Sequence, residues 1–467
     1  MMKFYLRNGF ISLYKTWFIL QRSCSLAIIP HFLNCRKAYG VMVCSILTHP
    51  NGYDSINAMR AWLTPFIDSI KNLAVIRYLP ENFDATERRL VVQAGIVGVV
   101  VWAFVFVLKQ LVHFTFEWVI RPEERGDSLA LLFIPMLFGA LVVAWITGLK
   151  ASTIHFRDSK GKLHALIDAE GDGLERAISL YFSSEPALEQ TLLGAEGVEM
   201  RWQMPTFSLA IRKFIATLIT LGSGGSGGLE GSVTLIGESV AAGLFKPRPV
   251  VEKANTRVGW VGKIWKWWQT STPDDLQTAQ LGGIAAAVSA LLGAPFAAAF
   301  FAIEVMYRRR PIIEKLIYAL ISSLVSYFLS NVATGGHSSM FEVENLPSPP
   351  NNLRFFVALI VLSILIALVS IYFKNMKQSL EHWFFSLPIR RWQRHLLGAL
   401  VTSMIAYLVT IVCVQWLGYE EGLTLVLGTG EAPLNTALRG ELPVMVALLA
   451  LFAKLFAVLM TVGAGGS

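Results

Sequence analysis

Two segments of this chain, far apart in the sequence, end in the same way. Lys213-Phe-Ile-Ala-Thr-Leu-Ile-Thr-Leu-Gly-Ser-Gly-Gly-Ser226 aligns without a gap with Lys454-Leu-Phe-Ala-Val-Leu-Met-Thr-Val-Gly-Ala-Gly-Gly-Ser467. Lys, Ala, Leu, Thr, three Gly and the final Ser coincide. Chance similarity between apolar segments does not explain the shared Lys and the matched glycines. We therefore predict an internal repeat in which each copy is an apolar helix ending at a glycine-rich break.

The composition places this repeat in a membrane. Of the 467 residues, 54% are hydrophobic and 15% are charged, whereas soluble domains carry about 25% charged residues. Several apolar runs approach the roughly 20 residues that a helix needs to cross the hydrocarbon. Gly293-Ala-Pro295 interrupts one of them and predicts two shorter helices there. The predicted spans are Leu90–Leu108, Leu129–Leu149, Leu281–Ile303, Leu316–Ser330, Phe355–Phe373, Leu396–Leu417 and Leu442–Val462.

The net charge of +8 fits such a protein without a nucleic-acid partner. Basic residues gather in loops, at Arg308–Arg310 and among the tryptophans of Phe245–Asp275, as expected for cytoplasmic loops at lipid headgroups. We predict an all-α polytopic membrane protein with an inverted repeat. In such transporter folds the broken helices meet near the bilayer midplane and build the substrate site. A plasma membrane or bacterial inner membrane is the expected location.

The first glycine break carries a single acid. Gly222–Gly237 reads Gly-Ser-Gly-Gly-Ser-Gly-Gly-Leu-Glu-Gly-Ser-Val-Thr-Leu-Ile-Gly. Its first residues resemble a flexible linker, because Gly and Ser impose little backbone preference. The apolar flanks and the repeat favour backbone packed inside the membrane domain instead. Glu230 then lies at membrane depth, where an isolated carboxylate is costly and usually functional.

A second glycine motif precedes a short apolar-periodic stretch. Gly171-Asp172-Gly173 is typical of a loop that leads into the N-terminus of a helix. Free backbone N–H groups at such a terminus can receive an anion. The simpler interpretation, which this motif alone favours, is that Asp172 is the helix N-cap.

Together these motifs resemble those of the CLC chloride channel and transporter family. Gly227-Gly-Leu-Glu-Gly-Ser232 is similar to its Gly-Arg/Lys-Glu-Gly-Pro signature, and Leu292-Gly-Ala-Pro295 through Glu304 to its Asn-Ala-Pro…Phe-Ala-Ile-Glu segment. Gly171-Asp-Gly-Leu-Glu175 occupies the place of its Gly-Ser-Gly-Ile-Pro motif. Gly463–Ser467 looks like the approach to its Gly-x-Phe-x-Pro motif.

The resemblance implies transmembrane conduction of chloride or another small anion. Members are homodimers, and each subunit holds its own anion pathway, ringed by the N-termini of half-helices. Glu230 resembles the gating glutamate, whose carboxylate competes with the anion. The implied anion-binding positions are Gly171, Asp172, Gly173, Gly228, Leu229, Gly231 and Ser232.

Three departures from the family pattern limit this transfer. Asp172 and Glu175 stand where the family has Ser and Pro, and Ser232 replaces the Pro of the gate motif. An ionised Asp172 at the central site would repel chloride, so it should be turned away, protonated or balanced by a cation. The resemblance also implies a membrane domain over residues 90–467 that is truncated before its last helices.

One position bears on the transport mechanism. Exchangers of the family generally carry two consecutive acids where this chain has Glu304-Val305, and the second acid relays protons. Val305 binds no proton and favours a passive voltage-gated chloride channel. Some exchangers lack that acid, so a proton-coupled chloride antiporter remains the alternative.

Other classes of function find little support. No catalytic His/Asp/Ser constellation and no metal-ligand cluster lies in the spans, so we expect no enzyme, cofactor or metal. The four cysteines show no CxxC pairing. A non-conducting membrane scaffold or truncated product is the alternative from another class. Residues 1–60 form a basic extension, either a transit peptide or sequence upstream of a true start at Met42 or Met59.

Overall fold

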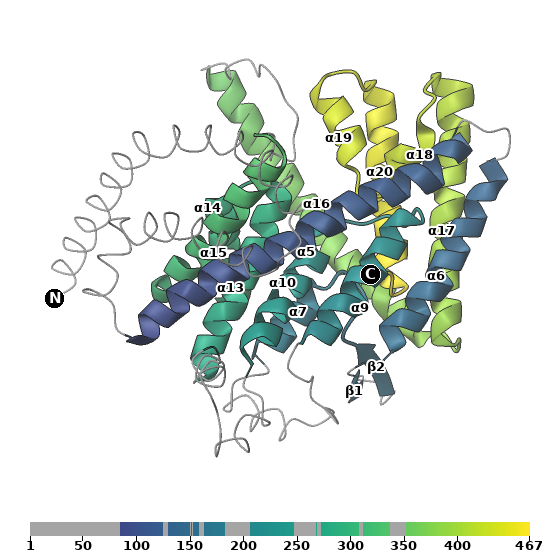
Figure 1. The fold of residues 1–467 in the computed structure, drawn as a ribbon. Helices are drawn as coiled ribbons and strands as arrows, with labels where there is room; N and C mark the ends of the chain where they lie inside the picture. The colour runs from purple at the N-terminus through teal and green to yellow at the C-terminus, as the bar shows by residue number, and fades with distance from the viewer. Residues whose placement is uncertain are drawn as a thin grey trace, which may run out of the picture. The chain divides into compact units, whose positions relative to one another are not determined.

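The fold comes from a computed structural model of the chain (Figure 1). It describes residues 85–124, 129–149, 151, 153–157, 163–182, 206–246, 268, 272–307, 312–336 and 352–467. The predicted extension over residues 1–60 lies outside the described residues, as do Arg308–Arg310 and most of the basic loop after Phe245.

The described part is built of helices, with one short hairpin. The helices are α5 (Ala85–Glu124), η1 (Leu129–Leu132), α6 (Phe133–Gly148), α7 (Leu174–Tyr181), α9 (Phe207–Gly222), α10 (Glu230–Phe245), α13 (Pro273–Leu292), α14 (Pro295–Tyr307), α15 (Ile313–Ala333), α16 (Leu353–Ser386), α17 (Arg391–Val412), η3 (Cys413–Leu417), α18 (Gly422–Val426), α19 (Glu431–Leu438) and α20 (Val444–Gly463). The strands β1 (Thr153–Arg157) and β2 (Leu163–Ile167) pair antiparallel, with Thr153 opposite Ile167.

The predicted spans correspond to helices. Five of the described helices, α5, α15, α16, α17 and α20, are long and apolar enough to cross a membrane. The predicted split of Leu281–Ile303 is also present, because α13 ends at a left-handed Gly293 (φ 69°) and Pro295 opens α14. Pro is favoured at the first turn of a helix, where its missing N–H is not needed. α16 continues well beyond its predicted end at Phe373.

The sequence repeat is also a structural repeat. α9 and α20 end in the same geometry, because Gly224 and Gly465 both take left-handed φ values, 105° and 102°. In each copy, the backbone N–H five residues after the threonine that the two copies share donates back to that threonine's carbonyl oxygen. The N···O distances are 2.7 Å to Thr220 and 2.9 Å to Thr461. A residue with a Cβ strains this conformation, which explains why the glycines recur.

The two breaks face each other and exchange contacts. The backbone N–H of Ser226 donates to the Thr461 hydroxyl at 3.3 Å, and the N–H of Ser467 donates to the Thr220 hydroxyl at 3.3 Å. This reciprocity is what an internal two-fold relation produces. It brings the ends of α9 and α20 together inside the protein, as the repeat predicts.

The helices of the first half pack through small residues. Gly237 of α10 and Gly283 of α13 lie so close that a Cβ on either one would overlap the backbone of the other. Serine hydroxyls connect the neighbouring helices, since Ser322 and Ser326 of α15 donate to carbonyl oxygens of α5 and α13 at 2.7 and 2.8 Å. In a bilayer the hydrophobic effect does not drive helices together, so close backbone packing and interhelical hydroxyl hydrogen bonds hold them in contact.

Candidate functional site

The glycine break before Glu230 is mostly buried and paired, so it is not a linker, whereas Gly228 and Glu230 themselves are exposed. Ser226 forms a parallel bridge with Gly428 of the second half, and its hydroxyl donates to the carbonyl oxygen of Val426 at 2.8 Å. The backbone of Gly227 donates to Gly428 at 3.3 Å. These bonds fix the point at which α10 begins.

The two glycine motifs that the sequence singles out lie against each other. A Cβ on Gly173 would stand 2.8 Å from the carbonyl oxygen of Gly231, and one on Gly231 would stand 2.6 Å from that of Asp172. The Ser232 hydroxyl donates to the Asp172 carbonyl at 3.3 Å. The start of α7 and the start of α10 therefore meet at one place.

Asp172 is not the N-cap of α7. Gly173 occupies that position with a left-handed φ of 100°. Asp172 Oδ1 instead accepts the backbone N–H of Leu174 at 3.1 Å, as in an Asx-turn. The local geometry demands Gly173, because a side chain there would meet both conformational strain and the α10 backbone.

The second carboxylate oxygen of Asp172 carries an ion pair. Lys377 of α16 donates to Asp172 Oδ2 at 2.6 Å and to Glu175 Oε1 at 3.3 Å. Burial raises the pKa of the Asp172 carboxyl, but the Lys377 charge and hydrogen bond outweigh it and hold that pKa below its ordinary value. Asp172 is therefore ionised and balanced by a cation, the third of the three options that the sequence allowed.

A cavity of about 200 Å³ brings these groups together with the gate candidate. Both copies of the repeat contribute to its wall, and α16 adds an aromatic ring and the cation. The lining includes Asp172, Leu174, Thr220, Ser226, Gly228, Glu230, Gly231, Ser232, Phe373, Lys377, Thr461 and Ser467.

Glu230 is the first residue of α10, and its carboxylate folds back over Gly228. A carboxylate beside a helix N-terminus is favoured by the helix dipole and by the unpaired N–H groups there. The same groups would favour a bound anion in its place. The side chain of Leu229, by contrast, packs in the core, so only its backbone could serve an anion.

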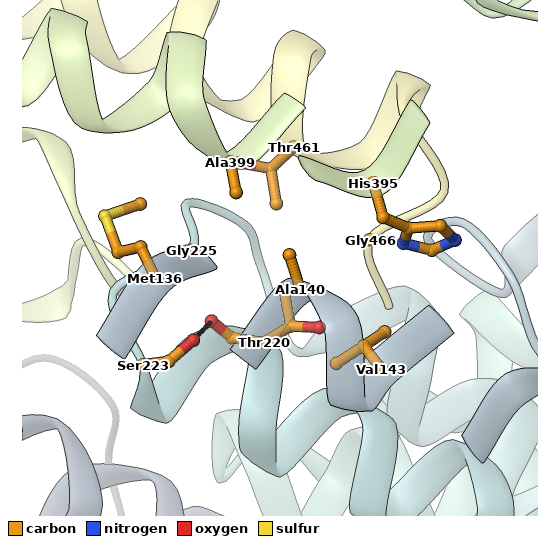
Figure 2. A pocket seen from close by; sticks show the side chains of 10 residues that line it. All are labelled: Met136, Ala140, Val143, Thr220, Ser223, Gly225, His395, Ala399, Thr461 and Gly466. Carbon is orange, nitrogen blue, oxygen red and sulfur yellow. Dashed lines mark hydrogen bonds between the residues drawn. The ribbon is translucent and has the colours of Figure 1, made fainter. Parts of the chain in front are cut away.

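A smaller cavity of about 30 Å³ adjoins the same breaks (Figure 2). Thr220, Thr461 and Gly466 line both cavities. Figure 2 shows His395 of α17 and Met136 of α6 at the edges of the smaller one. Its volume suits about one water molecule.

A buried acid holds the turn before Asp172 in place. Glu170 accepts hydrogen bonds from Arg391, from Arg394 at 2.9 Å and from His395 at 3.1 Å, all on α17. Burial raises the pKa of Glu170, but the His395 hydrogen bond and the surrounding positive charges hold that pKa at about 2. Arg394 also donates to the Ala464 carbonyl at 3.1 Å, which links the turn to the second break.

Val305 lies on α14 and packs against an apolar cluster that includes Ala302, Met306 and Ala319. Position 305 therefore carries an apolar side chain and no carboxylate that could relay protons. Within the described residues, no group of three or more His, Cys, Asp or Glu side chains is arranged to hold a metal.

Sequence reasoning missed Lys377. It lies 205 residues after Asp172, four residues beyond the predicted end of an apolar run, and no local pattern joins the two. It also missed the second copy of the glycine turn. Gly428-Thr-Gly430 precedes α19 as Gly171-Asp-Gly173 precedes α7, and the shared Gly-x-Gly pattern before a short helix is the signal in the sequence.

Comparison with known proteins finds a match to one protein family. The family model described as voltage gated chloride channel matches residues 183–467. None of the curated proteins matches this sequence.

Solved structures share the fold. A slow cyanobacterial Cl⁻/H⁺ antiporter aligns with a TM-score of 0.57 at 14% identity, covering 81% of this chain and 74% of that one. A CLC-type fluoride/proton antiporter aligns with a TM-score of 0.53 at 16% identity, covering 81% and 75%. With its apolar spans, its paired helix breaks and this family match, the chain is a multi-pass integral membrane protein that belongs to the voltage gated chloride channel (CLC) family.

Proposed function

We propose that this protein conducts chloride and other small anions through the cavity between the two breaks, with Glu230 as the gate. The observation that carries the proposal is the position of Glu230. It stands at the first turn of α10, on the wall of a cavity that both halves of the repeat line. The family match supports anion transport as the function.

The gate works by competition in this proposal. The Glu230 carboxylate and a chloride ion both favour the partial positive charge at the start of α10, so only one of them occupies it. The backbones of Gly228, Gly231 and Ser232 would then contact the anion, together with the turn at Gly171-Asp172-Gly173. Backbone donors bind an anion without a full charge, so that it can also leave.

Passive movement is the favoured mode. Val305 supports it, because a valine binds no proton. The two solved structures compared above are named as proton antiporters, but at 14% and 16% identity they share the fold and carry no mechanism with them.

Chloride efflux from liposomes containing the full-length protein tests the gate. Glu230→Gln keeps the size of the side chain but removes its charge, so we expect chloride efflux to change severalfold and to lose its response to acidification. Glu420→Gln, at an exposed position, is the matched control. Wild-type rate and wild-type pH response in Glu230→Gln would show that Glu230 is not the gate.

The same vesicles separate the two modes of transport. A chloride gradient drives uphill proton movement only in an antiporter. Passive conduction predicts chloride flux without proton pumping. Proton pumping would overturn the passive mode and leave the anion pathway in place.

A further inference from the structure

A carboxylate lies on the wall of the proposed anion pathway, where its charge should repel the substrate. Asp172 lines the same cavity as Glu230, and its side chain is 31% exposed. At separations of a few ångströms, two negative charges repel by several kcal/mol unless water or a counter-charge screens them. Anion conduction past Asp172 therefore needs a compensating cation.

Lys377 is placed to supply that charge. Its side chain is 13% exposed, it lines the cavity, and its ammonium nitrogen lies 2.6 Å from Asp172 Oδ2. The other cations near Asp172 have other contacts. Lys213 donates to the Gly171 carbonyl oxygen at 2.5 Å, and Arg176 lies 3.8 Å from the Glu175 carboxylate.

The pair joins elements that are otherwise distant in the chain. Asp172 belongs to the turn before α7, which packs against the start of α10, and Lys377 belongs to α16. Phe373, one turn earlier on α16, lines the same cavity. α16 thus presents one aromatic ring and one ammonium group to the proposed pathway, although most of its surface is exposed.

We propose that Lys377 is a specificity-determining residue of the anion pathway, which neutralises Asp172 so that the two side chains present a net neutral wall to the permeating anion. This inference rests on the proposed function, because it assigns a role within the same cavity. A lysine alone would hold the anion too tightly, and an aspartate alone would exclude it. The pair avoids both outcomes.

Chloride efflux from liposomes with charge-removing variants of the full-length protein tests the pair. Lys377→Met leaves the Asp172 carboxylate unbalanced, and we expect chloride efflux to fall by about tenfold or more. In an Asp172→Ser background the same substitution should lower efflux by less than about threefold, because the Asp172 carboxylate is gone and the remaining partner of Lys377, Glu175, is more exposed to water. Lys374→Met, an exposed position one turn away, is the matched control and should keep the wild-type rate.

A second readout separates a charge effect from a packing effect. Asp172→Ser alone leaves Lys377 without its main partner, so chloride should reach half-maximal flux at a lower concentration than in the wild type. A purely structural role would not move that concentration. Lys377→Arg keeps the charge and should retain most of the flux.

The outcomes are distinct. Unchanged efflux in Lys377→Met, or an equal loss in both backgrounds, would overturn the role of the pair. If Lys377→Met does not give a monodisperse protein, Lys377→Gln in the two backgrounds provides the same comparison. Wild-type protein without chloride flux would overturn the proposed function and this inference with it. If the wild type conducts chloride and efflux changes in Glu230→Gln but not in Lys377→Met, this inference is overturned and the proposed function stands.

Discussion

At the scale of single residues, the site depends on two glycines that let backbones touch. Gly173 combines a left-handed φ of 100° with a contact to the Gly231 carbonyl oxygen that leaves no room for a Cβ. The turn at Asp172 and the start of α10 can therefore share one wall. Neither Gly173 nor Gly231 can be replaced by alanine without a steric clash. In the sequence alone, Gly231 belongs to a motif that resembles a flexible linker, and Gly173 to one that resembles a simple helix cap.

Gly173→Ala is expected to destabilise the protein by about 2–4 kcal/mol, since left-handed strain adds to overpacking against α10. The thermal unfolding midpoint in detergent measures it, and chloride efflux should fall in parallel. Gly95→Ala is the control, because Gly95 lies in α5 and a Cβ there has nothing within 4 Å. It should be neutral or slightly stabilising. Equal midpoints for both variants would contradict the close contact.

Glu170 makes the folding stability of the protein depend on pH. Its pKa is about 2 in the folded protein and 4.5 ordinarily, so the ionised form is favoured by folding. A lowered pKa contributes stability that is complete above pH 4.5 and is lost as the pH falls from there toward 2. The contribution is on the order of 3 kcal/mol at neutral pH.

Thermal unfolding between pH 7 and pH 3 checks this dependence. Glu170→Gln should unfold at a lower temperature than wild type at pH 7, because Arg391 and Arg394 lose their buried partner. That difference should shrink as the pH falls below 4.5. Glu420→Gln, at an exposed position, should show no such convergence. A difference that stays constant with pH would mean that Glu170 is not ionised in the native state.

At the scale of elements, the repeat explains one buried and one half-buried lysine that a membrane helix would not otherwise keep. Lys213 of α9 and Lys454 of α20 occupy equivalent positions, and each donates to the turn that precedes a short helix. Lys454 donates to three carbonyl oxygens, those of Val426, Leu427 and Gly428, at 3.1, 3.2 and 2.6 Å. Lys213 thus links the turn at Gly171 to α9, and Lys454 links the turn at Gly428 to α20.

Lys454→Met should therefore destabilise the second half of the repeat. It removes the lysine donor from the carbonyl oxygens of Val426, Leu427 and Gly428, of which Val426 and Gly428 keep a second donor, and we expect a loss of about 2–4 kcal/mol. The thermal midpoint measures it, and Lys374→Met supplies the same chemical change at an exposed position as the control. An unchanged midpoint in Lys454→Met would show that the lysine does not support the turn.

At the scale of the whole molecule, the two halves meet through the reciprocal contacts of Ser226 with Thr461 and of Ser467 with Thr220. Both breaks line the cavity. Neither half could therefore form the proposed pathway alone, and mutations in either break should affect the same flux.

Assembly into a homodimer is the prediction at this scale. It follows from the family to which the chain belongs, in which each subunit carries its own pathway. Light scattering with detergent correction should give twice the mass of one chain for the full-length protein. A monomer with normal chloride flux would contradict the dimer and leave the pathway intact.

Much of this architecture follows from the sequence. Apolar runs determine where helices cross the hydrocarbon, because an unpaired backbone is too costly there. Pro295 and Gly293 mark the break between α13 and α14 for local steric reasons. The shared Lys and glycines of Lys213–Ser226 and Lys454–Ser467 reveal the repeat. Glu230 is conspicuous because a lone acid is rare at membrane depth.

What the tertiary structure decided is which distant groups share a cavity. Local patterns favoured Asp172 as an N-cap, yet the fold gives that position to Gly173 and gives the Asp172 carboxylate to Lys377. Glu170 likewise acquires its cations from α17, more than 220 residues later in the chain. Charge pairing through space has no sequence period, whereas helix formation and helix breaking do. The sequence therefore determined the helices and their breaks, and packing alone determined how the charge of Asp172 is balanced.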